Sequence, residues 1–183
     1  MTTPIPDLVV VGAGTMGAWT ALRARRAGWS TTLIDAFGAG HPRSTSGDET
    51  RICRASHGAD AFYVRWAREA RQAWIDFGEE TGEAFYLQCG MAWFAHREDA
   101  FEAHSIATLT SMGIPIERVP ADEIGQRWPG VRGDDLAFAA FEPEAGLLFA
   151  RRGVAAVARA FGAAGGRFEL AGVRPGAFGN TWP

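Results

Sequence analysis

The sequence of 183 residues contains no lysine, so all 18 of its basic side chains are arginines, and we attribute this bias to a GC-rich coding sequence. The 21 acidic residues are interspersed with the arginines and give a net charge of −3. No basic surface is therefore expected for nucleic acid or an anionic membrane. The sequence also lacks an apolar run of the roughly 20 residues that span a bilayer, and a charged segment ahead of an apolar one. We expect a soluble, cytoplasmic protein.

Cysteine is scarce, with only Cys53 and Cys89 present. Two cysteines so far apart exclude a disulfide framework and a zinc site. We expect both to be buried free thiols. His96 and His104 have no Glu or Cys at ligand spacing, so the sequence predicts no metal site.

The most informative feature of the sequence is a glycine-rich turn. The apolar residues 8–11 lead into Gly12-Ala13-Gly14-Thr15-Met16-Gly17, and a helical stretch over 16–27 follows. In such a motif Gly12 allows the tight turn, Gly14 lets the backbone approach a pyrophosphate, and Gly17 lets helix and strand pack closely. A second strand over 30–34 delivers Asp35, an acid placed for ribose hydroxyls. The pattern predicts a Rossmann-like dinucleotide-binding βαβ unit, the alternative being an ordinary βαβ turn with a solvated Asp35.

The rest of the chain predicts a mixed α/β fold with an α+β insert. We expect a helix over 62–77 whose apolar positions Phe62, Trp66, Ala70, Ala73, Trp74 and Phe77 pack a core. Around Gly90, residues 83–95 predict a bent strand or a strand pair. Further elements are expected as helices over 99–112, 120–127 and 152–164, and as strands over 114–119, within 136–149 and over 168–170. The last strand would return, parallel, to the nucleotide-binding sheet.

The segment after Asp35 indicates which dinucleotide is bound. Asp35-Ala36-Phe37 precedes a Gly/Pro/Ser-rich loop over 38–47, and then comes Gly47-Asp48-Glu49-Thr50-Arg51-Ile52-Cys53-Arg54. With these residues the chain resembles the flavin-dependent amine oxidases of the D-amino-acid oxidase superfamily, in particular the monomeric sarcosine oxidase and N-methyl-tryptophan oxidase group. Later segments agree, at 63–74, 81–94, 127–130 and 141–149, so the resemblance runs from about residue 8 to about residue 170.

The resemblance implies FAD as cofactor and oxidation of an amine or N-methyl amino acid, with oxygen as acceptor and hydrogen peroxide as product. It implies that Arg51 lies against the flavin and that Arg54 reaches the substrate carboxylate, a task that suits the planar fork of arginine. Both arginines are the candidate catalytic residues. The implied cofactor-binding residues are Gly12, Gly14, Thr15, Met16, Gly17, Asp35, Ala36, Phe37, Ser44, Thr50, Arg51 and Ile52.

Several readings of the arginine loop stay open. Arg51 and Arg54 are three residues apart and would also suit ordinary pairing with Asp48, Glu49 or other surface acids. Where the sarcosine oxidase pattern has a histidine ahead of its acid-Thr-Arg run, this chain has Gly47. His41 and His57 flank the loop and are expected to be solvated rather than catalytic.

The domain organisation that the resemblance implies is an FAD-binding part over 1–61, an inserted substrate-domain portion over 62–141, a return to the FAD-binding domain over 142–170 and an irregular tail over 171–183. Because family members are about twice this length, we expect a truncated chain, with a reading frame or gene model that departs from the family near Gly172. The alternatives to an oxidase are a non-catalytic fragment and an NAD-dependent dehydrogenase. The sequence does not indicate an oligomeric state.

Overall fold

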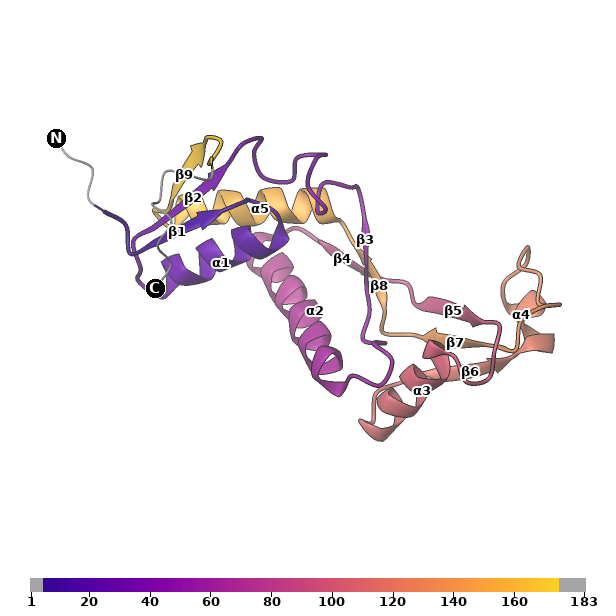
Figure 1. Cartoon of the computed structure of the whole chain (residues 1–183). Coiled ribbons are helices and arrows are strands. Elements are labelled where there is room, and N and C mark those ends of the chain that lie inside the picture. The colour runs from indigo at the N-terminus through magenta and orange to yellow at the C-terminus, as the bar shows by residue number, and fades with distance from the viewer. Residues whose placement is uncertain (1–4, 175–183) are drawn as a thin grey trace. The chain divides into compact units, whose positions relative to one another are not determined.

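In the computed structural model, residues 5–174 are described, and they fall into two compact units. The chain passes from the first unit to the second after Arg51 and returns at Phe149 (Figure 1). The unit boundaries at 51/52 and 148/149 lie ten residues before and seven residues after the domain boundaries expected at 61/62 and 141/142. The irregular tail was expected over 171–183, and its residues 175–183 lie outside the described part of the chain.

The first unit is a three-stranded parallel sheet. Strand β1 (Leu8–Val11) pairs with β2 (Thr31–Asp35), and β2 pairs with β9 (Arg167–Leu170), which gives the order β1-β2-β9. Helix α1 (Thr15–Arg26) connects the first two strands, and α5 (Ala150–Ala163) precedes the third. The predicted βαβ unit and the predicted third parallel strand are both confirmed.

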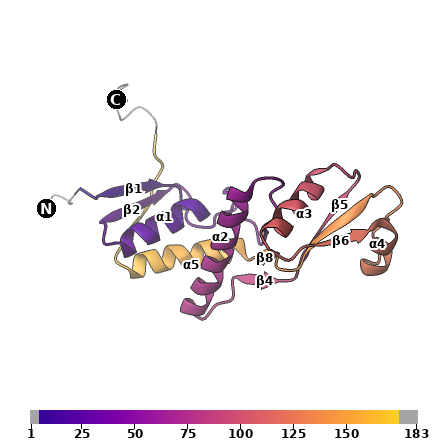
Figure 2. The same cartoon turned by 90° about the horizontal axis from the view of Figure 1, so that it is seen from below.

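Helices α1 and α5 lie side by side and pack against one face of this sheet (Figure 2). Small and apolar side chains fill the space between the helices and the sheet, and the buried ones are Ala18, Ala21, Leu22, Leu33, Val154, Val157 and Phe161. On the strands, side chains alternate between faces. Val9 and Val11 therefore point away from the helices and are 49% and 63% exposed.

The second unit contains two small sheets. In one, β8 (Gly146–Leu148) lies between β3 (Arg51–Cys53) and β4 (Tyr86–Gln88), and in the other β7 (Phe138–Glu142) lies between β5 (Met91–Ala95) and β6 (Glu117–Pro120). The segment around Gly90 does form two strands as expected, but each pairs with a strand from elsewhere in the chain, β4 with β8 and β5 with β7. Gly90 has φ +73° and so turns the chain from one sheet into the other.

Three helices complete the second unit: α2 (Ala61–Thr81), α3 (Phe101–Ser111) and α4 (Ala121–Arg127). The carboxylate of Asp60 caps α2 by accepting from the backbone N–H groups of Phe62 and Tyr63, at 3.1 and 3.5 Å. Helices α3 and α4 contact the strands of the β5-β7-β6 sheet. The predicted helices are thus present, with ends shifted by a few residues.

The expectation that the whole apolar face of α2 packs a core is wrong. Trp74 and Phe77 are buried beside Phe85, but Phe62 and Trp66 are 45% and 57% exposed and Ala70 is exposed. In the first half of the helix it is Val64 that enters a core cluster, with Leu109 of α3 among its members. Periodicity shows that a helix has an apolar stripe, and the tertiary contacts decide how much of it is covered.

Two further expectations are corrected. Residues 51–53, expected as part of a loop, form β3. Both cysteines are free thiols as expected, but neither is fully buried, since Cys53 is half-buried and Cys89 is exposed. Within residues 5–174, no helix is both long and apolar enough to cross a membrane.

Candidate functional site

The glycine-rich turn has the geometry that its three glycines predict. Gly12 has φ +100° and donates its N–H to the carbonyl of Ile34 at 2.7 Å, which ties the turn to β2. A Cβ on Gly17 would lie 1.8 Å from the carbonyl oxygen of Gly12 and 3.3 Å from Val10, so only glycine lets α1 begin this close to β1. A Cβ on Gly14 would meet only the Ser46 hydroxyl, at 3.6 Å. The backbone at Gly14 is therefore open to a close approach from outside the chain.

Asp35 lies at the end of β2 and binds the turn directly. One carboxylate oxygen accepts from the N–H of Ala13 at 2.7 Å, and the other accepts from Phe37 and Gly38 at 2.7 and 2.8 Å. Partial burial would raise the pKa of this carboxyl, but the three N–H donors outweigh burial and hold the pKa below its usual value. Asp35 is thus held as a carboxylate, and since its two oxygens offer about four acceptor positions, a further hydroxyl donor still fits.

A serine beside the start of α1 was missed by the sequence reasoning. The Ser46 hydroxyl accepts from the backbone N–H of Thr15 at 3.1 Å and contacts the Thr15 hydroxyl at 2.9 Å. The predicted Ser44 instead bonds within its own loop, where its hydroxyl donates to the carbonyl of His41 at 2.9 Å. Because Ser44 and Ser46 occur in one short Ser-Thr-Ser run, spacing alone could not show which of them meets the turn.

Two of the remaining predicted residues of the first unit are exposed apolar side chains. Met16 is 81% exposed on the first turn of α1, and Phe37 is 51% exposed, with the Arg43 guanidinium 4.7 Å from its ring centre. Ala36 is exposed and Thr50 is half-buried. These positions leave apolar and backbone groups available to a ligand bound at the turn.

Arg51 follows the loop after β2, and its side chain binds back to that loop. Its guanidinium donates to the carbonyl of Thr45 through Nε at 2.9 Å and Nη2 at 2.6 Å, and it pairs with the Asp48 carboxylate. The alternative expectation, pairing with a nearby acid, therefore holds for Arg51. The next residue, Ile52, is 59% exposed and begins the second unit.

Arg54 belongs to the second unit and has different surroundings. Its guanidinium lies 4.7 Å from the ring centre of Trp93 and 6.0 Å from that of Phe101, and it donates to the carbonyl of Ser56. Burial lowers the pKa of Arg54, while the negative charge of Glu142 opposes that shift. Arginine stays protonated in proteins despite such shifts. The chain thus holds a cationic fork on an aromatic platform, a suitable group for a carboxylate.

The two histidines that flank the arginine loop are half-buried rather than fully solvated. His41 accepts from the N–H of Arg43 at 3.2 Å, and the ring of His57 lies 5.9 Å from that of Tyr63. Burial and the charge of Arg54 lower the pKa of His57. Within residues 5–174, no group of three His, Cys, Asp or Glu side chains is arranged to hold a metal ion.

Comparison with known proteins agrees with these features. A family described as "FAD dependent oxidoreductase" (DAO) matches residues 7–174. The monomeric sarcosine oxidase of Bacillus sp. (strain B-0618) is 32% identical over 144 residues, covering 78% of this chain and 37% of that protein. The N-methyl-L-tryptophan oxidase of Yersinia pestis (strain Pestoides F) is 28% identical over 159 residues, covering 87% of this chain and 43% of that protein.

Solved structures share the fold at lower identity. L-proline dehydrogenase from P. horikoshii superposes with a TM-score of 0.78 at 22% identity, covering 92% of this chain and 45% of that one. Glycine oxidase from Geobacillus kaustophilus gives 0.73 at 20% identity, covering 89% and 46%. This chain thus spans less than half the length of these relatives. The parallel sheet, the glycine-rich turn and the family match over 7–174 lead to one conclusion: the chain belongs to the FAD dependent oxidoreductase (DAO) family.

Proposed function

We propose that this chain carries the FAD-binding turn and the substrate arginine of an oxidase that acts on the C–N bond of an amino acid or N-methyl amino acid. The observation that carries the proposal is the contrast between Gly17, which packs too closely for any side chain, and Gly14, where a Cβ would meet only the Ser46 hydroxyl. A turn of this kind brings backbone N–H groups against a pyrophosphate. Membership in an FAD-dependent family favours FAD over NAD.

In this proposal the predicted cofactor-binding residues, all in the first unit except Ile52, contact different parts of FAD. Gly12, Gly14, Thr15, Met16 and Gly17 hold the pyrophosphate. Asp35 accepts from ribose hydroxyls, with Ala36 and Phe37 beside it. Ser44, Thr50, Arg51 and Ile52 lie along the flavin side, where the Arg51 charge favours an electron-rich ring.

The substrate step needs a fixed cation and a hydride acceptor. FAD, when bound, accepts a hydride from the carbon next to the amine nitrogen, and dioxygen takes up the electrons to give hydrogen peroxide. Arg54 binds the substrate carboxylate and so orients that carbon. The names of the relatives, sarcosine oxidase, N-methyl-L-tryptophan oxidase and glycine oxidase, support an amino acid or N-methyl amino acid as the substrate class.

The test is FAD binding by the purified chain, because the chain spans less than half of its relatives and turnover is a separate question. We expect saturable binding with a stoichiometry of one, measured by flavin fluorescence. Gly14→Val, which places a side chain where the pyrophosphate would lie, should abolish this binding while the circular dichroism spectrum stays that of the wild type. Unchanged FAD affinity in Gly14→Val would show that the turn is not the binding site.

A further inference from the structure

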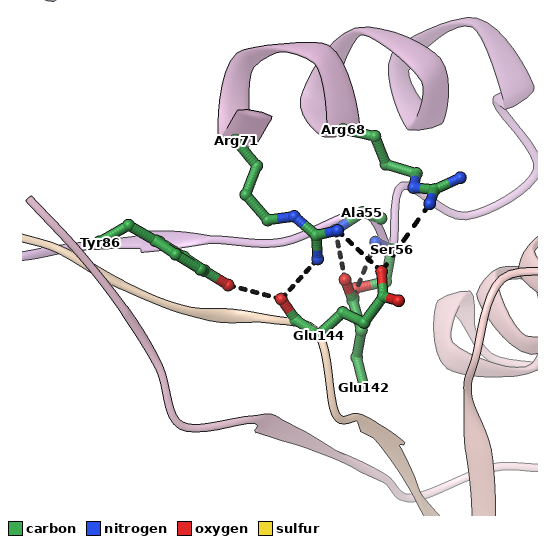
Figure 3. Close-up of polar contacts among 7 residues, drawn as sticks. All are labelled: Ala55, Ser56, Arg68, Arg71, Tyr86, Glu142 and Glu144. Carbon is green, nitrogen blue, oxygen red and sulfur yellow. Dashed lines mark hydrogen bonds and ion pairs between the residues drawn. The ribbon is translucent and has the colours of Figure 1, made fainter. Parts of the chain in front are cut away.

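The turn between β7 and β8, residues 142–146, is held by two neighbouring elements of the second unit. Arg71 of α2 donates to the Glu144 carbonyl at 2.7 Å and to the Glu144 carboxylate at 2.8 Å (Figure 3). The Tyr86 hydroxyl of β4 donates to the same carbonyl, and Arg68 lies 3.9 Å from the carboxylate. With an exposed fraction of 16% for the Arg71 side chain and 28% for that of Glu144, these bonds are well shielded from water. These contacts hold the turn that follows Glu142, the last residue of β7.

Glu142 is a buried carboxylate, only 1% exposed. One of its oxygens accepts from the backbone N–H of Ala55 at 2.6 Å and the other accepts from Ser56 at 3.0 Å (Figure 3). A buried charge is costly unless it is hydrogen-bonded, and such charge-assisted bonds are stronger than neutral ones. The carboxylate therefore fixes two consecutive peptide groups, which are the ones that follow Arg54.

Ser56, the second of these residues, contacts both Arg54 and the Trp93 side chain. Ser56 offers its carbonyl to Arg54 and accepts, through its hydroxyl, from the indole N–H of Trp93 at 3.1 Å. Trp93 in turn presents its ring to the guanidinium at 4.7 Å. The carbonyl that accepts from Arg54 and the hydroxyl that accepts from Trp93 thus both belong to Ser56, whose backbone N–H is bound to Glu142.

We propose that Glu142 is a positioning residue that sets the direction of the Arg54 guanidinium. Without its carboxylate, the N–H groups of Ala55 and Ser56 would be buried and unbonded, which destabilises this conformation of the peptides. The segment 54–56 would then shift, moving Ser56 and its carbonyl, and Arg54 would leave the Trp93 ring. The consequence for carboxylate binding rests on the proposed function of Arg54, whereas the positioning itself does not.

The test compares Glu142→Gln with Glu144→Gln in the full 183-residue chain. The amide in Glu142→Gln keeps the volume but replaces one acceptor oxygen with a donor that faces a backbone N–H. Glu144→Gln makes the same chemical change two residues away and leaves the Ala55 and Ser56 bonds intact. With arginine labelled by nitrogen-15, the Arg54 Nε–H resonance should be shifted by the Trp93 ring in wild type and in Glu144→Gln, and should lose that shift in Glu142→Gln.

A second readout uses acetate and N-methylglycine as probes. We expect their dissociation constants to rise about tenfold in Glu142→Gln and to stay within about twofold in Glu144→Gln. Should Glu142→Gln fail to fold, Glu142→Asp, which keeps the charge and shortens its reach, should show a partial loss of the ring shift. A wild-type Arg54 resonance in the folded Glu142 variant would overturn the positioning role. If the wild-type chain binds neither probe, the proposed role of Arg54 falls, and the resonance still decides the role of Glu142.

Discussion

Replacing Gly17 with alanine tests the packing of the glycine-rich turn most sharply. The new Cβ would lie 1.8 Å from the Gly12 carbonyl oxygen, so helix and turn must separate by about 1.2 Å to reach the 3.0 Å at which real contacts begin. Forcing extra volume into a packed site costs about 1–3 kcal/mol. For a chain of this size each kcal/mol lowers the melting temperature by about 2–4 °C. We therefore expect Gly17→Ala to melt several degrees below the wild type in a thermal scan without added FAD.

Gly162→Ala is the matched control for this variant. Gly162 lies inside α5, and a Cβ there meets nothing within 4 Å. Alanine is the better helix former by about 0.8–1 kcal/mol, so this variant should be as stable as the wild type or more so. Equal melting temperatures for Gly17→Ala and the wild type would refute the claim that close packing requires glycine at this position.

Three more perturbations follow from the polar contacts. Burial and the Arg54 charge lower the pKa of His57, so folding stability should fall as the pH drops below about 6.5 and stay level above that pH. Arg54→Gln should raise the His57 pKa in a proton NMR titration, and an unchanged pKa would show that the Arg54 charge does not contribute to the shift. The backbone donors lower the pKa of Asp35 despite burial, so the stability that its carboxylate contributes is present above about pH 3.9 and is lost as the pH falls through the folded-state pKa. Asp35→Asn should be less stable at pH 7, and its free energy of unfolding should depend less on pH in acid. The same acid dependence as in the wild type would count against this role of Asp35. Arg71→Met, which leaves the Glu144 carboxylate without this partner, should lower the free energy of unfolding in urea by about 1–3 kcal/mol, and no change would mean that the bond contributes nothing.

The first unit could be predicted almost entirely from the sequence. Its strands are short apolar runs, and its first helix begins at a glycine-rich turn and ends before Gly28, so local signals coincide with the tertiary arrangement. The return of a third parallel strand, β9, to this sheet was also predicted, whereas its pairing with β2 is known only from the structure. The segment around Gly90 was harder, because local sequence shows that two strands occur but not that each pairs with a distant partner.

The candidate site was only partly visible in the sequence. Arg54 was singled out by its motif, but its platform, Trp93 and Phe101, comes from segments about 40 residues away. Glu142 lies within 141–149, one of the segments that match the family, and only the fold shows that its carboxylate binds the backbone beside Arg54. A sequence gives residue types and local spacing, whereas such long-range hydrogen bonds depend on how the strands pair.

The central claim is that this chain, with its open Gly14 and its carboxylate at Asp35, holds FAD. The direct measurement is a titration of the purified chain with FAD, followed by flavin fluorescence and by thermal melting. We expect one FAD per chain and a melting temperature that rises with FAD concentration, with about 2.7 kcal/mol of added stability at a free concentration 100 times the dissociation constant. A fluorescence signal and a melting temperature that both stay constant as FAD is added would contradict this claim.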